Sequence, residues 1–181
     1  MKPYDYAHRE GVDEITWERF AELAAILAEQ LVAYKIEAVI GIARAGLFPA
    51  TAVALALRCE FFPVRVTRRR NDQVTYDHPD WKVGVSPEVD GKVVAVIDEM
   101  ADSGETLALV AEEARRFRAA RVVTASLVRH SWAKPVPDAC ALVTDAFVIF
   151  PWDRRVLIDG VWQVHPEIEK GLRVQNMKES S

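Results

Sequence analysis

Three acids follow an apolar run within one short segment, and their spacing suits a bound sugar. Residues 93–97 read Val-Val-Ala-Val-Ile and are followed directly by Asp98 and Glu99, then after two spacers by Asp102. Adjacent carboxylates suit two neighbouring hydroxyls, as on a ribose, because a carboxylate accepts hydrogen bonds without offering a competing donor. A buried strand would place these acids at its carboxyl end, where α/β sheets bind ligands.

Small and hydroxyl-bearing residues continue the segment. Ser103, Gly104 and Thr106 offer hydroxyls and unobstructed backbone N–H groups at the start of a helix expected over residues 106–117. The positive end of a helix dipole favours phosphate. A diol site beside a phosphate site predicts binding of a ribose 5-phosphate group. The alternative is that Asp102 or Ser103 caps the helix, while Asp98 and Glu99 are solvated acids at a strand end.

The elements that position these residues alternate along the chain. Apolar residues at three- to five-residue spacing predict an amphipathic helix, capped by Thr16 or Asp13: Ile15, Phe20, Leu23, Leu27, Leu31 and Tyr34. Short apolar runs at 38–42, 61–66, 93–97, 122–128 and 147–150 indicate strands, and residues 47–57 indicate a further helix. Strands that alternate with helices predict an α/β fold with a central, mostly parallel sheet flanked by helices.

Two stretches fit neither period. Residues 67–89 are polar and basic at their start, and a loop of that length in a small domain is usually a functional lid or disordered. Residues 171–181 are expected to form a mobile tail. With 181 residues, half of them hydrophobic, and no long polar interruption, the chain is expected to form a single domain, 1–181.

Composition excludes several classes of protein. A net charge of −4 and a pI near 5.6 argue against a protein that grips nucleic acid. Cys59 and Cys140 are widely spaced in apolar stretches, which favours reduced thiols and gives no metal motif. The start of the chain lacks a basic-then-apolar leader, and no apolar run approaches the roughly 18–20 residues that cross a bilayer. We therefore expect a soluble, cytoplasmic protein without a membrane or nucleic-acid partner.

Nucleotide-binding motifs of other folds are missing from the sequence. No Gly-x-Gly-x-x-Gly follows a strand, and no Gly-x-x-x-x-Gly-Lys-Ser/Thr occurs. Both a dinucleotide-binding domain and a nucleoside triphosphatase are disfavoured.

The segment from residue 93 to Thr106 resembles the signature that binds phosphoribosyl pyrophosphate (PRPP) in type I phosphoribosyltransferases. The resemblance covers about residues 15–153 and is strongest to the xanthine/guanine/hypoxanthine branch. Residues 40–50 resemble the pyrophosphate loop of that family, with Ala45 in place of the usual glycine. Residues 147–153 are similar to the hood that closes over the base, which we place at about 130–165.

The resemblance implies a Mg²⁺-dependent enzyme of purine salvage that transfers the phosphoribosyl group of PRPP to a purine base. The favoured base is a 6-oxopurine. It implies that Asp102 is the catalytic residue that handles the proton at N7 of the base, and that Glu99 with Asp98 helps to hold Mg²⁺. It also implies a cis peptide in the pyrophosphate loop. The residues implied to bind PRPP are Arg44, Ala45, Gly46, Arg68, Arg69, Asp98, Glu99, Ala101, Ser103, Gly104, Glu105 and Thr106.

Base recognition is assigned by the same resemblance. Phe147 would stack on the purine and backbone groups of Val148 would read its edge, although Phe147 could equally be a hydrophobic strand residue. His130 takes the place of a lysine that contacts O6 of the base, and a shifted register nominates Lys134. As a lone residue, His130 is otherwise a satisfied or surface histidine.

Residues 67–89 would form the flexible loop that closes over the reacting carbon. Arg68 and Arg69 could also be a solvated strand end, and Arg44 could be a surface arginine in a turn.

The alternative functions are a non-catalytic PRPP or nucleotide sensor on the same fold and a transferase for a non-purine acceptor. Members of the family are commonly dimers or tetramers, so we expect a homodimer or homotetramer.

Overall fold

The computed structural model describes residues 8–67, 69–70, 73–74 and 80–179. Its contacts group the chain into two compact units, residues 22–144 and residues 1–21 with 145–181. We call them the core unit and the terminal unit. The division at residue 21 lies inside helix α1 (Trp17–Val32), so no Pro- or Gly-rich linker marks it in the sequence.

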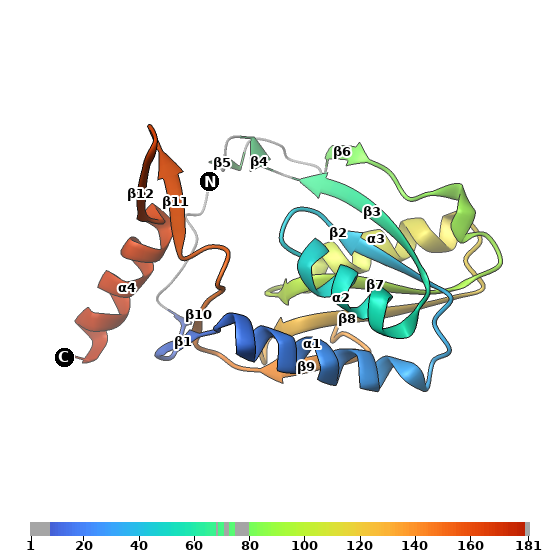
Figure 1. Cartoon of the computed structure of the whole chain (residues 1–181), viewed down its shortest axis with the longest axis horizontal. Helices are drawn as coiled ribbons and strands as arrows, with labels where there is room; N and C mark the ends of the chain where they lie inside the picture. The colour runs from blue at the N-terminus through green and yellow to red at the C-terminus, as the bar shows by residue number, and fades with distance from the viewer. Residues whose placement is uncertain (1–7, 68, 71–72, 75–79, 180–181) are drawn as a thin grey trace. The chain divides into compact units, whose positions relative to one another are not determined.

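The core unit is built on a six-stranded sheet in the order β6-β3-β2-β7-β8-β9. The strands are β2 (Ala38–Ile42), β3 (Glu60–Thr67), β6 (Asp80–Val83), β7 (Val93–Ala101), β8 (Arg121–Arg129) and β9 (Ala139–Val143). Every pairing is parallel except that of β3 with β6. The predicted α/β fold with a mostly parallel sheet is confirmed (Figure 1).

Alternate residues of the central strands face opposite layers, as the two-residue period of a strand requires. Ile40 and Val96 belong to the cluster that packs against α3 (Glu105–Arg116). Val39 and Ile97 belong to the cluster that includes residues of α1 and α2 (Leu47–Leu57). The sheet is thus buried on both faces, which is why β2 and β7 read as continuous apolar runs.

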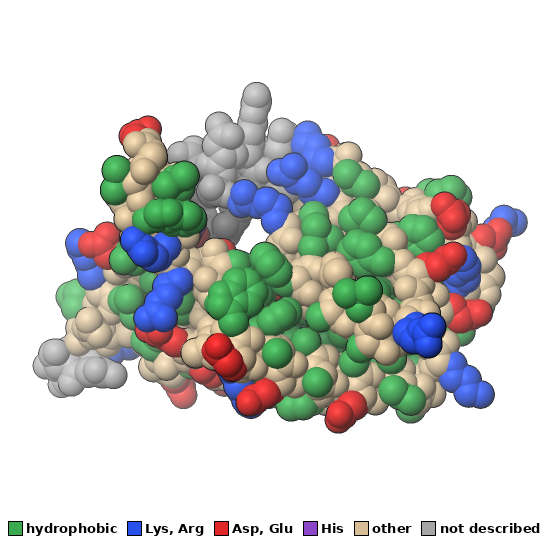
Figure 2. All heavy atoms as spheres, in the orientation of Figure 1, with side chains coloured by type: hydrophobic (Ala, Val, Ile, Leu, Met, Phe, Trp, Pro, Cys, Tyr) green, Lys and Arg blue, Asp and Glu red, His purple; other side chains and the backbone are tan. Residues whose placement is uncertain are grey.

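The helices follow from local sequence signals. Leu23, Leu27 and Leu31 of α1 are all fully buried at helical spacing. The Thr16 hydroxyl accepts a hydrogen bond from Arg19 N at 3.1 Å, which confirms the predicted cap. Helix α2 carries no charged residue, and its Leu55 side chain is 74% exposed. Hydrophobic side chains accordingly gather over α2 in Figure 2.

The terminal unit contains β1 (Val12–Glu14) paired in parallel with β10 (Phe147–Ile149). The hairpin β11 (Arg155–Ile158) and β12 (Val161–Val164) follows, then α4 (Pro166–Glu179). Residues 171–179 of the expected mobile tail are helical and belong to α4. Ile168 packs with Phe147, and Gln175 is buried, so contacts with the strands hold this helix in place.

The segment 67–89 has more regular structure than its composition indicated. It contains β4 (Arg69–Arg70) paired with β5 (Gln73–Val74), the edge strand β6, and the 3₁₀ turn η2 (Pro87–Val89). Ser86 accepts a hydrogen bond from Glu88 N and caps that turn. The predicted closing loop lies partly outside the described residues, so its role stays a prediction.

Both cysteines are free and half-buried. Burial raises the pKa of the Cys59 thiol and of the Cys140 thiol, which keeps them protonated and unreactive. Among the described residues, no helix is both long and apolar enough to span a bilayer.

Close packing of α4 against β10 can be tested at Gly171. A Cβ there would lie 2.5 Å from Cζ of the Phe147 ring, which is itself buried, so the ring cannot easily move away. Alanine normally favours a helix over glycine, yet we expect Gly171→Ala to destabilise the protein by about 1–3 kcal/mol through this clash. Calorimetric melting would measure it. Gly84→Ala is the matched control, since a Cβ at Gly84 meets nothing within 4 Å. An unchanged or raised melting temperature for Gly171→Ala would contradict the packing.

Candidate active site

The site residues converge where the order of the strands reverses. From β2 the chain moves to β3 on one side, whereas β7, the other neighbour of β2, leads to β8 on the opposite side. Loops that leave adjacent strands in opposite directions open a crevice at their carboxyl ends. Here those loops are residues 43–46 after β2 and residues 102–104 after β7, so the structure brings both predicted segments together.

The acid pair lies near the end of β7. Asp98 and Glu99 are half-buried, and Glu99 N donates a hydrogen bond to Asp98 Oδ1 at 2.9 Å. Desolvation raises the pKa of Asp98. Desolvation, reinforced by the neighbouring Asp98 charge, raises the pKa of Glu99 well above its ordinary value of 4.5. Two crowded, poorly hydrated carboxyls favour either a shared proton or a cation.

The acid pair fits Mg²⁺. In the parts of the chain that the structure describes, no group of three or more His, Cys, Asp or Glu side chains could hold a metal ion. Two carboxylates match Mg²⁺, which usually keeps waters and ligand phosphates around it and takes only one or two protein carboxylates. Asp98 and Glu99 would therefore complete the shell of a metal bound chiefly through its ligand.

The loop after β2 approaches the acid pair at Gly46. A Cβ on Gly46 would lie 2.6 Å from Asp98 Oδ1 and 2.5 Å from Ile42 O. Its backbone is right-handed helical, with φ −60°, so glycine is required for space and not for conformation. The peptide bond between Ala43 and Arg44 is cis, as the family resemblance implied, and the Arg44 side chain is exposed.

The loop after β7 turns into α3 through Gly104, whose φ of +83° suits glycine. Ser103 Oγ accepts a hydrogen bond from Glu105 N at 3.3 Å, but the N-cap residue of α3 is Gly104, so Ser103 stabilises the turn before the helix and is not its cap. The side chains of Ser103, Glu105 and Thr106 are exposed at the helix start, whereas Ala101 is buried. A phosphate at this turn would meet hydroxyls and the positive end of the helix dipole.

Asp102 lies in the sequence between the acid pair and the turn that would meet a phosphate. Its carboxyl is half-buried, and its Oδ1 accepts a hydrogen bond from the indole Nε1 of Trp132 at 3.2 Å. The sequence analysis did not identify Trp132, because the contact joins segments thirty residues apart and no spacing signal marks it.

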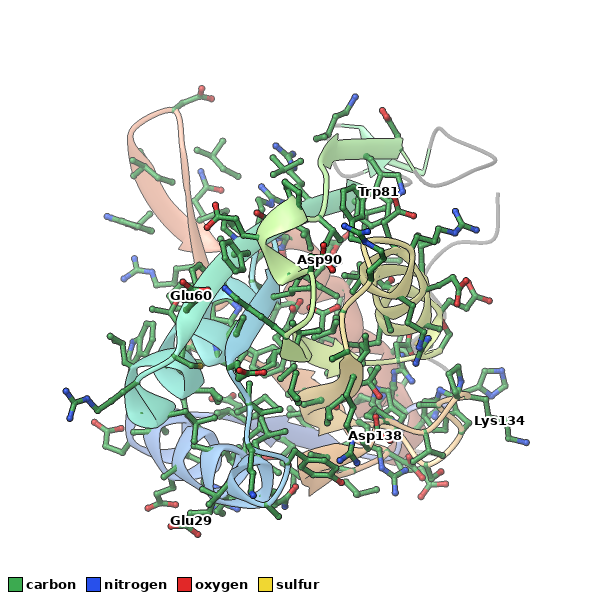
Figure 3. The ribbon with its side chains drawn as sticks, turned by 90° about the vertical axis from the view of Figure 1, so that its right-hand side faces the viewer. Glu29, Glu60, Trp81, Asp90, Lys134 and Asp138 are labelled. Atoms are coloured by element: carbon green, nitrogen blue, oxygen red, sulfur yellow. The ribbon has the colours of Figure 1, made fainter. Side chains whose placement is uncertain are left out.

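His130 is buried, whereas a side chain that binds a ligand at a strand end would be accessible. It is 1% exposed, its Nδ1 donates to Thr144 O at 2.6 Å, and its ring stacks on Trp132. The sequence left a satisfied histidine as the alternative, and the structure gives a partner to Nδ1 of this buried ring. Lys134 is exposed, and Figure 3 shows it at the periphery of the core unit. Contact of either residue with a base stays a prediction.

Two predicted PRPP ligands cannot be placed. Arg68 lies outside the described residues. Arg69 belongs to β4, but its side chain lies outside the described part of the structure. Their contact with pyrophosphate stays a prediction.

In the terminal unit, β10 buries the Phe147 ring but directs the backbone groups of Val148 to a strand edge. The Phe147 ring is 8% exposed and packs beside Gly171, so the structure describes it as the hydrophobic strand residue that the sequence left as an alternative. Phe147 N donates to Gly11 O, and Ile149 O accepts from Ile15 N. Since successive strand residues direct their backbone groups to opposite sides, those of Val148 face the edge of β10 away from β1. That edge suits the predicted reading of a base.

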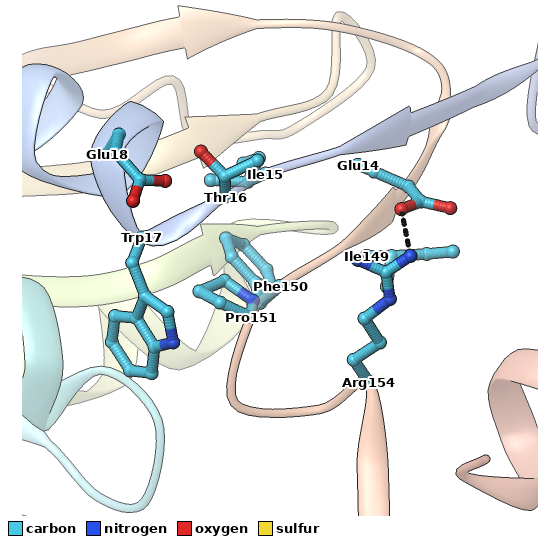
Figure 4. A pocket seen from close by; sticks show the side chains of 9 residues that line it. All are labelled: Glu14, Ile15, Thr16, Trp17, Glu18, Ile149, Phe150, Pro151 and Arg154. Carbon is cyan, nitrogen blue, oxygen red and sulfur yellow. Dashed lines mark ion pairs between the residues drawn. The ribbon is translucent and has the colours of Figure 1, made fainter.

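A pocket of about 190 Å³ lies within the terminal unit (Figure 4). Its lining combines three aromatic or proline side chains with two acids and an ion pair between Arg154 and Glu14, which is 3.0 Å long. The lining residues are Glu14, Ile15, Thr16, Trp17, Glu18, Ile149, Phe150, Pro151 and Arg154. A hydrogen bond from its own backbone, with a second from Thr16, lowers the pKa of Glu18, so this acid is charged. Because Arg154 pairs with Glu14 and leaves the charge of Glu18 unbalanced, the lining would repel phosphate, and the pocket does not suit PRPP.

Comparison with known proteins identifies the family. The family model described as "Phosphoribosyl transferase domain" matches residues 11–159. Two curated relatives are xanthine-guanine phosphoribosyltransferases. That of Gluconobacter oxydans is 29% identical over 147 residues, which cover 77% of this chain and 83% of the relative. That of Idiomarina loihiensis is 28% identical over 147 residues, with 77% and 85% covered.

A solved structure is similar as well. The purine phosphoribosyltransferase of Pyrococcus horikoshii superposes with a TM-score of 0.71 at 28% identity, covering 82% of this chain and 98% of the other. The match covers nearly all of that enzyme.

Gly46 offers a test of the site's geometry. Gly46→Ala would force the loop after β2 away from Asp98, because the clashing atoms belong to a backbone carbonyl and a half-buried carboxylate. A displacement of this size near reacting groups can lower kcat/KM roughly 10- to 100-fold. Initial rates with PRPP would measure the loss, and a melting curve would separate it from unfolding. An unchanged kcat/KM would contradict the close approach of loop and acid.

Proposed function

Since the chain belongs to the phosphoribosyl transferase domain family, we propose that it transfers the 5-phosphoribosyl group of PRPP to a purine base. The products are a nucleoside monophosphate and pyrophosphate, and the role is purine salvage. A 6-oxopurine is the favoured acceptor, because two relatives bear the name xanthine-guanine phosphoribosyltransferase. The observation that carries the proposal is the approach of Gly46 to Asp98, next to Glu99, at the switch point of the sheet.

Each segment of the site has a part in this reaction. Asp98 and Glu99 accept hydrogen bonds from the 2′ and 3′ hydroxyls of the ribose, and the turn at residues 102–106 holds the 5′-phosphate at the start of α3. Arg44 and the backbone of the loop after β2 receive the pyrophosphate. The bond from C1′ to the pyrophosphate oxygen breaks while a ring nitrogen of the base bonds to C1′, and Asp102 takes up the proton that the base loses.

Mg²⁺ is the cofactor that this site would use. The carboxylates of Glu99 and Asp98 would hold it together with oxygens of PRPP and water. When bound, the ion offsets negative charge on the pyrophosphate group.

The test of the proposal is pyrophosphate release from PRPP and Mg²⁺, with xanthine, guanine, hypoxanthine, adenine and uracil supplied separately. Turnover with a 6-oxopurine is expected. Turnover with uracil alone would replace the purine acceptor by a pyrimidine. Binding of PRPP without turnover of any base would favour a non-catalytic sensor, against which the presence of Asp102 counts, since a sensor has no need of a proton acceptor at the base.

Asp102→Asn gives a sharper expectation. The amide keeps the shape of the side chain but cannot accept the proton, so kcat should fall roughly 10²- to 10⁴-fold while the dissociation constant of PRPP changes little. Stopped assays and calorimetric titration would measure the two constants. An equal loss of turnover and of PRPP affinity would contradict the role of Asp102 as proton acceptor.

We also expect the protein to associate with itself, as a homodimer or homotetramer. Helix α2 supports this, because it exposes Phe48 and Leu55 and lacks charge. In a twofold contact a helix meets its own copy, and an uncharged helix does so without like-charge repulsion. Light scattering should give a mass of two or more chains, and Leu55→Glu should lower it. A single-chain mass for the wild type would contradict the expectation.

A further inference from the structure

Trp132 lies in the turn after β8, and its indole Nε1 donates a hydrogen bond to Asp102 Oδ1 at 3.2 Å. We propose that Trp132 is a positioning residue for Asp102. Its N–H fixes the plane of the carboxylate, so that the proton-accepting oxygen is directed at the base. The inference rests on the proposed function to the extent that Asp102 is the group that takes the proton.

The indole is itself held in place by His130. The two rings stack with centroids 4.5 Å apart and an angle of 17° between their planes. His130 is 1% exposed, and its Nδ1 donates to Thr144 O at 2.6 Å. A buried ring fixed to the main chain therefore provides a rigid platform on which the 38% exposed Trp132 side chain lies.

Backbone hydrogen bonds connect the two segments on both sides of this contact. His130 N donates to Ala101 O at 3.2 Å, and Lys134 N donates to Ser103 O at 2.9 Å. Ala101 and Ser103 flank Asp102, just as His130 and Lys134 bracket Trp132. The Trp132–Asp102 hydrogen bond thus lies between two backbone hydrogen bonds that hold the two segments together on either side of it.

The chemistry of indole suits this role. Indole N–H is a donor only, so Trp132 can orient the carboxylate but cannot take the proton from it. A hydrogen bond to a charged acceptor is about 1.5–3 kcal/mol in strength, enough to favour one orientation of the carboxylate strongly. Because rate depends on the direction of the proton acceptor, loss of the N–H should lower turnover without changing how PRPP binds.

The test begins with Trp132→Phe, which keeps an aromatic ring against His130 but removes the N–H donor along with one of the two fused rings. We expect kcat to fall roughly ten-fold, with the PRPP dissociation constant and the melting temperature close to the wild type. Trp162→Phe is the matched control, since Trp162 is 58% exposed on β12 and should leave kcat unchanged. An unchanged kcat for Trp132→Phe overturns the proposal.

A double-mutant cycle separates positioning from a general structural effect. In an Asp102→Ala background there is no carboxylate to orient, so Trp132→Phe should have no further effect on kcat. An equal loss in both backgrounds would overturn the proposal. If Trp132→Phe lowers the melting temperature, a second replacement at position 132 is needed. Benzothienylalanine replaces the indole N–H by sulfur in a ring of the same shape, so it must reproduce the loss of kcat. If kcat is unchanged with benzothienylalanine, the proposal fails.

The same experiment separates this inference from the proposed function. Wild-type protein that turns over no base overturns both. Wild-type turnover that Asp102→Ala lowers strongly but Trp132→Phe leaves unchanged overturns only the role of Trp132.

Discussion

The desolvated carboxyl pair near the end of β7 is the constraint on which the rest of the site depends. Asp98 and Glu99 lie side by side on a strand buried by both layers of the core unit, and their pKa values are raised by the loss of water around them. Such a pair destabilises a folded chain unless a proton, a cation or donors accompany it. The neighbouring loop adds to the crowding, because Gly46 leaves room for Asp98 only by lacking a side chain. A ligand that brings hydroxyls and a divalent cation relieves this electrostatic cost.

The central part of this arrangement could be predicted from sequence. Val-Val-Ala-Val-Ile before Asp98 indicates a buried strand, and burial on both faces follows from a mostly parallel sheet. The carboxyl end of that strand then has to be the ligand crevice. Leu23, Leu27 and Leu31 similarly define α1 by their spacing alone. These predictions succeeded because period and burial are properties of one segment at a time.

The features that the sequence analysis missed depend on contacts between distant segments. β1 is three residues long and pairs with β10, more than 130 positions away. Helix α4 is mostly polar and is held by contacts with Phe147. The direction of the His130 ring, and with it the role of Trp132, follows from a carbonyl at Thr144. The hairpin β11–β12 is different: Asp159-Gly160 between two β-rich runs is a type I′ turn signal, and both residues have positive φ, so the sequence did contain that information.

The raised pKa of Glu99 and the proposed binding of Mg²⁺ at this pair together imply that protons leave the carboxyls when a cation and ligand bind, and proton counting tests this most directly. Because desolvation and the neighbouring Asp98 charge raise the pKa of Glu99, its carboxyl keeps a proton to higher pH than an ordinary glutamate does, and metal binding requires the carboxylate. Calorimetric titration of Mg·PRPP in two buffers of different ionisation enthalpy measures the protons exchanged. We predict net release from the wild type that exceeds release from Glu99→Gln, and that diminishes as the pH rises through the pKa of Glu99. Equal proton exchange in the two proteins at every pH would contradict the account.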